Sequence, residues 1–219
     1  MNKNSMIKKT AEFARKTLAG EGSGHDWWHV YRVWRMAKQI AKEEKADIFI
    51  VELAALLHDI SDWKFSAGND KLGSQITEKF LSKLRVDQEI INDVKYIVLN
   101  ISYKGGTNKV KLQTIEGKIV QDADRLDAIG AIGIARTFAF GGSIKREFYN
   151  PGIKPKKYKD FEDFKNNLDK NTTINHFYEK LLLLKKLMHT KTAKRIAEGR
   201  HKYMEEYLKK FYKEWEGKE

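Results

Sequence analysis

A few histidines and aspartates of this sequence could together bind a divalent metal ion. Two of the six histidines, His29 and His58, stand in or beside apolar segments, and Asp59 follows His58 directly. A lone buried histidine is more often a packing group than a ligand, whereas two histidines with nearby carboxylates form a good site for manganese, iron, cobalt, nickel or zinc. The chain has no cysteine, which excludes a thiolate site, so any metal must be held by histidine and carboxylate groups.

Three more aspartates interrupt the otherwise apolar stretch VQDADRLDAIGA: Asp122, Asp124 and Asp127. Burying an ionised carboxylate without a partner is costly, so this segment calls for a compensating positive charge. Arg125 supplies one, and a divalent cation would supply a larger one. The residues alone leave open which aspartate would be a ligand, because Asp124 and Asp127 are three apart and share a helix face.

The elements that must position these residues are all predicted to be helices. In residues 26–45 the apolar spacing turns His29 inward, and Asp26 is a candidate N-cap. Residues 46–58 are apolar nearly all round, which indicates a central buried helix that ends in the doublet His58-Asp59. Apolar residues at helical spacing predict the other helices at 5–19, 72–84, 87–99, 111–140 and in two or three segments within 161–215.

The expected architecture is a single all-α domain over residues 1–219. It has a metal-site core at 24–140, an irregular loop at 141–161 and C-terminal helices at 161–215. In the long helical pattern 111–140, Gly130 and Gly133 are expected to let a neighbouring helix approach closely. Aromatic residues at helical spacing near the end of the chain indicate packing groups or a homodimer interface: Tyr203, Tyr207, Phe211 and Trp215.

The formal net charge of +12 is compatible with nucleic acid, an anionic membrane or an anionic small substrate. The lysines are spread along the chain and no nucleic-acid-binding spacing is evident, so nucleic acid is not the favoured partner. No run of 18 apolar residues occurs, so no membrane helix is predicted, and the basic N-terminus lacks the apolar core of a signal peptide. The predicted location is therefore cytoplasmic.

The motifs together resemble the signature of the HD-domain metal-dependent phosphohydrolase superfamily. His29 precedes VYRVWRMA, which is similar to the family's HxxRVxxxA pattern, and His58 and Asp59 lie in AALLHDI. Asp124 lies in ADRLDAIG, which resembles the ADxL stretch around the family's last ligand. GHDWWH at 24–29 looks like a small bacterial branch, some members of which act on nucleoside triphosphates. The resemblance covers residues 24–140 and implies an all-α HD-type helical bundle.

The resemblance also implies a role for each candidate residue. It assigns four metal ligands: His29, His58, Asp59 and Asp124. It further implies that Asp62 orients or deprotonates the attacking water, as a carboxylate within hydrogen-bond reach can do. The remaining candidates would orient the ligands or contact a phosphate, with a surface or structural ion-pair role as the alternative: His25, Asp26, Lys64, Asp122, Arg125, Asp127, Lys145 and Arg146.

The implied reaction is hydrolysis of a nucleoside or deoxynucleoside triphosphate to the monophosphate and pyrophosphate by a metal-activated water. Mn²⁺ is the favoured cofactor, and the same ligands suit Mg²⁺, Ni²⁺, Co²⁺, Fe²⁺ or Zn²⁺. Hydrolysis of phosphomonoesters or cyclic nucleotides is an alternative reaction at the same site. Two non-catalytic alternatives are a nucleic-acid-binding protein and a sensor that binds a nucleotide without cleaving it.

Overall fold

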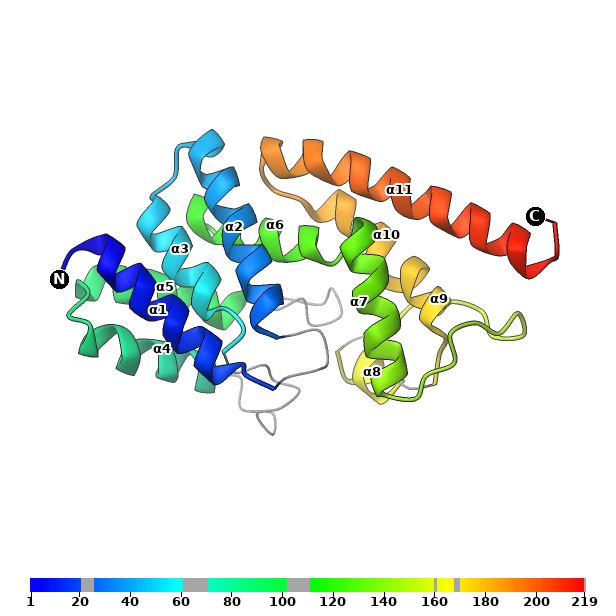
Figure 1. Cartoon of the computed structure of the whole chain (residues 1–219), viewed down its shortest axis with the longest axis horizontal. Helices are drawn as coiled ribbons and strands as arrows, with labels where there is room; N and C mark the ends of the chain where they lie inside the picture. Colours follow the sequence, from blue (N-terminus) through cyan, green and yellow to red (C-terminus); the bar gives the residue numbers. More distant parts are fainter. Residues whose placement is uncertain (21–25, 61–70, 102–110, 160, 168–169, 219) are drawn as a thin grey trace. The chain divides into compact units, whose positions relative to one another are not determined.

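The computed structural model describes residues 1–20, 26–60, 71–101, 111–159, 161–167 and 170–218 (Figure 1). Within these ranges all regular secondary structure is helical, which confirms the all-α prediction. None of these helices is both long and apolar enough to cross a membrane. The chain divides into two compact units, residues 1–123 and 124–219, and the single-domain architecture stays a prediction.

The first unit is built around a short apolar helix. Its described helices are α1 (Lys3–Thr17), α2 (Trp27–Glu44), α3 (Ile48–Leu57), α4 (Leu72–Lys83), α5 (Gln88–Asn100) and the greater part of α6 (Ile115–Asp127). The central helix α3 packs against α1, α2 and α5, and α4 packs against α5 (Figure 1). Leu53, Leu56 and Leu57 of α3 are fully buried, as its apolar sequence predicts.

Local signals set the ends of α2 and α3. Lys45 ends α2 with φ of 58°, a left-handed conformation that stops the helix. Asp47 then caps α3, because its Oδ1 accepts hydrogen bonds from the backbone N–H groups of Phe49 and Ile50. Only residues 45–47 separate the two helices, and such a short connection makes them antiparallel neighbours.

The predicted helix over 111–140 is wrong as a single element. The structure has α6, which ends at Asp127, and α7 (Gly130–Ser143), with a break at Ala128 and Ile129. Gly130 has φ of +78°, a conformation that costs other residues free energy and therefore ends the helical run here. A Cβ atom at position 133 would lie 2.3 Å from the carbonyl oxygen of Ala128, so glycine is required for the chain to fold back so tightly.

The second unit combines α7 with one long helix and several short ones. These are α8 (Phe161–Asn166), α9 (Thr173–His176), the π-helical turn η2 (Phe177–Leu181), α10 (Leu182–Leu184), the 3₁₀ turn η3 (Lys185–Leu187) and α11 (Lys191–Trp215). Both α9 and α11 pack against α7. The close approach predicted for Gly130 occurs with α11, since a Cβ there would lie 3.0 Å from Cγ of Arg200.

Glu179, on the π-helical turn, holds the irregular segment 144–159 in place. Its Oε1 accepts a 2.8 Å hydrogen bond from the backbone N–H of Lys156 and a further one from the side chain of Asn171. Its Oε2 accepts a 2.8 Å bond from the Tyr158 hydroxyl. Burial, together with Glu179, raises the pKa of Tyr158 to about 12.

Tyr207, Phe211 and Trp215 of α11 pack against other aromatic rings of the second unit, whereas Tyr203 is 51% exposed. Tyr207 stacks on Phe177, with 5.9 Å between ring centroids, and Trp215 meets the ring of Tyr149 edge-on at 4.7 Å. Trp215 nevertheless remains about half exposed. The homodimer stays a prediction.

Candidate metal centre

The N-terminus of α2 fixes the first proposed ligand. Asp26 caps the helix as predicted, because its Oδ1 accepts a 2.9 Å hydrogen bond from the backbone N–H of His29. The His29 side chain is 1% exposed, so its imidazole points into the first unit, as its place on the apolar stripe predicts. The cap therefore holds the backbone of the residue whose side chain enters the candidate site.

The C-terminus of α3 presents the second and third ligands. His58 follows Leu57, the last residue of the helix, and its Nδ1 lies 2.8 Å from the carbonyl oxygen of Ala55. A carbonyl oxygen can only accept a hydrogen bond, so we assign the proton to Nδ1 of His58. This tautomer leaves a lone pair on Nε2, the arrangement that a metal-binding histidine needs.

Three donor atoms converge where these two helix ends meet. Nε2 of His29 lies 3.2 Å from Nε2 of His58 and 3.7 Å from Oδ2 of Asp59. All three lie within 4.8 Å of one another, and no other group of three potential ligands comes together in the described residues. Bonds of about 2.1 Å to one ion place adjacent ligand atoms roughly 3 to 3.5 Å apart. The 3.2 Å between the two imidazole nitrogens fits this range, and the carboxylate oxygen, 3.7 Å from His29, lies slightly beyond it. The prediction that His29 and the His58-Asp59 doublet come together is confirmed, and their role as ligands stays a prediction.

The aspartates of α6 lie on either side of the boundary between the two units. Asp122 is fully buried in the first unit. Asp124, the proposed fourth ligand, is partly buried and is the first residue of the second unit, so its position relative to the three other ligands is not described. Its assignment as a ligand stays a prediction.

Arg125 contacts the segment that precedes α11. Its Nη1 donates to the backbone carbonyl of Leu187 and lies 3.1 Å from Nε2 of His189. Both partners come from the segment just before α11, in the same unit. These contacts favour a structural role for Arg125.

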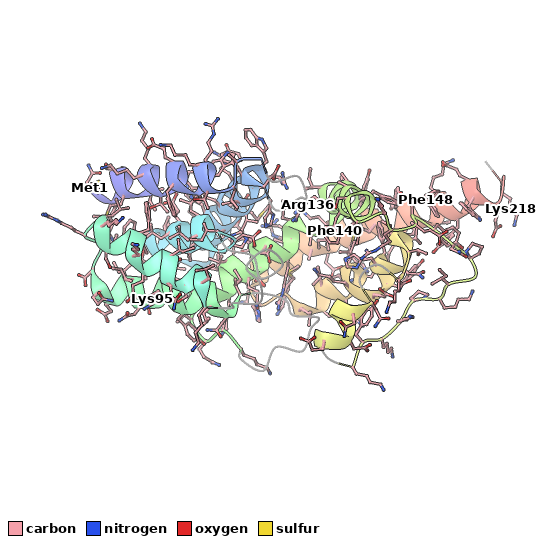
Figure 2. All side chains as sticks on the ribbon, turned by 90° about the horizontal axis from the view of Figure 1, so that it is seen from below. Met1, Lys95, Arg136, Phe140, Phe148 and Lys218 are labelled. Atoms are coloured by element: carbon pink, nitrogen blue, oxygen red, sulfur yellow. The ribbon has the colours of Figure 1, made fainter. Side chains whose placement is uncertain are left out.

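Two further arginines hold the last turn of α6. Nη1 of Arg136, labelled in Figure 2, donates to Oδ2 of Asp127 at 2.9 Å, and both side chains are largely buried. Nη1 of Arg200 donates to the carbonyl oxygen of Leu126 at 2.5 Å, and burial lowers the pKa of this guanidinium. Cations at a helix C-terminus are also favoured by the helix dipole. Neither arginine was predicted from the sequence, because 9 and 74 positions separate them from their partners.

The remaining candidates have different surroundings. Lys145 is exposed in a left-handed conformation with φ of 56°, and Arg146 is 8% exposed, with its guanidinium 5.8 Å from the ring centroid of Phe140. Both belong to the second unit. His25, Asp62 and Lys64 lie outside the described residues.

Comparisons with known proteins show the family to which this chain belongs. Residues 27–129 match the family model of the HD domain. The uncharacterized protein YpgQ of Bacillus subtilis is 38% identical over 221 residues, which covers 99% of this chain and 97% of that protein. An HD-superfamily hydrolase from Bacillus thuringiensis is 43% identical with a TM-score of 0.76, covering 98% of this chain and 99% of the other. The crystal structure of B. subtilis YpgQ in complex with ADP has a TM-score of 0.78 at 34% identity, covering 98% and 97%.

Proposed function

Because this chain belongs to the HD superfamily of metal-dependent phosphohydrolases, we propose that it hydrolyses nucleoside or deoxynucleoside triphosphates to the monophosphate and pyrophosphate. The observation that carries the proposal is the convergence of His29, His58 and Asp59 on one point. A nucleotide substrate is supported by the structure of the relative YpgQ, which was solved with ADP.

The proposed division of labour follows from the donor atoms. The two imidazole Nε2 atoms and Oδ2 of Asp59 would hold the ion, and we propose Asp124 as the fourth ligand. When bound, a divalent ion supplies Lewis acidity toward a phosphate oxygen and lowers the pKa of water. Mn²⁺ is the ion that we favour, since imidazole and carboxylate together suit it.

Residues beyond the ligands complete the proposed reaction. Asp62 would orient the attacking water and accept its proton, and pyrophosphate would leave as the bond to the α-phosphorus breaks. Lys64, Lys145 and Arg146 are the proposed phosphate contacts, because fixed positive charge stabilises the charge that develops on phosphate oxygens. His25 is proposed to contact the substrate or to orient a ligand.

Product analysis with a panel of nucleotides tests the proposal. Purified protein with Mn²⁺ is incubated separately with nucleoside triphosphates, monophosphates and cyclic nucleotides, and an Asp59→Ala variant is run alongside. Monophosphate plus pyrophosphate from triphosphates, absent with the variant, is the expected result. Free nucleoside from monophosphates, or opened cyclic nucleotides, would replace the proposed reaction with one of its alternatives. No product from any compound would contradict catalysis and favour a sensor.

A further inference from the structure

One buried acidic residue stands apart from the proposed chemistry. Glu52 is the only ionisable residue of α3, whose sequence is IFIVELAALL, and it is 7% exposed. Its Oε1 accepts a 2.9 Å hydrogen bond from the indole Nε1–H of Trp34. The same oxygen forms an ion pair with Nζ of Lys38, at a distance of 2.8 Å. Both donors belong to α2, so this carboxylate ties the helix that carries His58 to the helix that carries His29.

The tie and the metal centre lie along the same interface. Because α2 and α3 are antiparallel, the residues that follow His29 in α2 lie beside the residues that precede His58 in α3. Trp34 is five residues after His29, or about 7.5 Å along the axis, and Glu52 is six residues before His58, or about 9 Å. The tie at Glu52 and the two histidines therefore lie about one and a half helical turns apart along the same interface.

Register matters more for the metal centre than for the rest of the interface. A slip of one turn would move one histidine by about 5.4 Å relative to the other, whereas their Nε2 atoms now lie 3.2 Å apart. Such a slip would leave the two imidazoles too far apart to share an ion. Apolar contacts between the two helices have little directionality, while the bonds to Glu52 have fixed partners and directions.

Stability alone does not account for a glutamate at this position. Lys38 is 41% exposed, so only the carboxylate of this ion pair is buried. Replacing a buried ionised group by a well-packed apolar residue is often neutral or stabilising, because the ionised group loses hydration when it is buried. A leucine at position 52 would continue the apolar surface of α3. What a leucine would not provide is a specific partner for the indole of Trp34 and the ammonium group of Lys38.

We propose that Glu52 is a positioning residue, which sets the register of α2 against α3 and thereby brings the imidazoles of His29 and His58 together for metal binding. This inference rests on the proposed role of those histidines as ligands. It predicts that changes at Glu52 alter metal affinity and ligand geometry more than they alter stability.

Metal binding to Glu52 variants tests this. Protein stripped of metal is titrated with Co²⁺, and both the dissociation constant and the visible absorption spectrum of the bound ion are recorded. Glu52→Leu is expected to weaken binding by roughly tenfold to a hundredfold, the range seen when residues that orient ligands are changed, and to alter the spectrum. Glu52→Gln keeps an acceptor for Trp34 and is expected to restore most of the affinity. The matched control is Glu78→Leu, which removes the 2.6 Å ion pair between Glu78 of α4 and Lys95 of α5. Lys95 is labelled in Figure 2, and this variant should leave Co²⁺ binding unchanged.

The outcomes separate this inference from the proposed function. A folded Glu52→Leu variant with the affinity and spectrum of the unaltered protein would overturn the positioning role while leaving the metal centre intact. If Glu52→Leu does not fold, Trp34→Phe decides, since it removes only the indole donor from the tie. Weaker binding is then expected, and unchanged affinity would overturn the inference. If the unaltered protein binds no divalent ion at all, the proposed function fails and the positioning role fails with it.

Discussion

Replacing Gly133 by alanine is expected to destabilise the protein, although alanine is the better helix former. On helix propensity alone, the change in α7 would stabilise by about 1 kcal/mol. The added Cβ would, however, lie 2.3 Å from the carbonyl oxygen of Ala128, a backbone atom that cannot rotate away. Overpacking of this kind costs about 1 to 3 kcal/mol, and a fixed backbone partner places the cost at the upper end. We therefore expect a net loss of about 1 to 2 kcal/mol.

Gly142, in the same helix, provides the control for this prediction. A Cβ at position 142 meets nothing within 4 Å, so Gly142→Ala should gain up to about 1 kcal/mol from propensity. Thermal unfolding followed by circular dichroism measures both variants. Gly133→Ala should lower Tm by roughly 2 to 8 °C, and Gly142→Ala should raise it by up to about 4 °C. If Gly133→Ala is as stable as Gly142→Ala, the tight break between α6 and α7 is not as described.

Three further predictions concern Arg136, Tyr158 and Asp62. Arg136→Met should lower the free energy of unfolding by roughly 3 kcal/mol, because it removes a buried partner of Asp127. In urea unfolding, the double variant with Asp127→Asn should lose less stability than the sum of the two single variants, and additive losses would refute the pairing. The free energy of unfolding should fall as pH rises from about 10 to 12, because unfolded tyrosine ionises near pH 10 while Tyr158 keeps its proton to about 12. Tyr158→Phe should flatten that fall, and an unchanged slope would exclude this tyrosine as a cause. Asp62→Asn should retain bound Mn²⁺ in metal analysis yet lose most turnover, and normal rates would remove Asp62 from the mechanism.

The sequence predicts well those parts of the fold and of the candidate site that depend on local signals. The N-cap at Asp26, the inward face of His29 and the apolar helix before His58 each depend on residues within a few positions of one another. Such patterns express helix geometry and capping directly, so a single sequence contains them.

Contacts between distant segments explain what the sequence did not predict. Gly130 and Gly133 were visible in the sequence, but the end of α6 also depends on Arg200, which comes from α11. Arg125 contacts Leu187 and His189, which lie more than 60 positions further along the chain. No spacing rule connects groups that only the tertiary fold brings together.

The partners of Glu52, in the central helix of the first unit, were likewise not predictable from the sequence. In the sequence it is an isolated charge in an apolar helix, with nothing to indicate its partners. Only the antiparallel pairing of α2 and α3 brings it to Trp34 and Lys38. The residue proposed to position the metal ligands is thus outside the motif formed by His29, His58-Asp59 and Asp124.

The most direct test of the central claim is a metal titration in which binding and catalysis are measured on the same samples. Metal-free protein receives increasing Mn²⁺, and bound metal and pyrophosphate released from a nucleoside triphosphate are recorded at each step, with Asp59→Ala in parallel. The predicted result is that release of pyrophosphate rises in proportion to bound metal, and that the variant shows neither. Pyrophosphate release by metal-free protein, or full metal binding and turnover by Asp59→Ala, would contradict a catalytic metal at His29, His58 and Asp59.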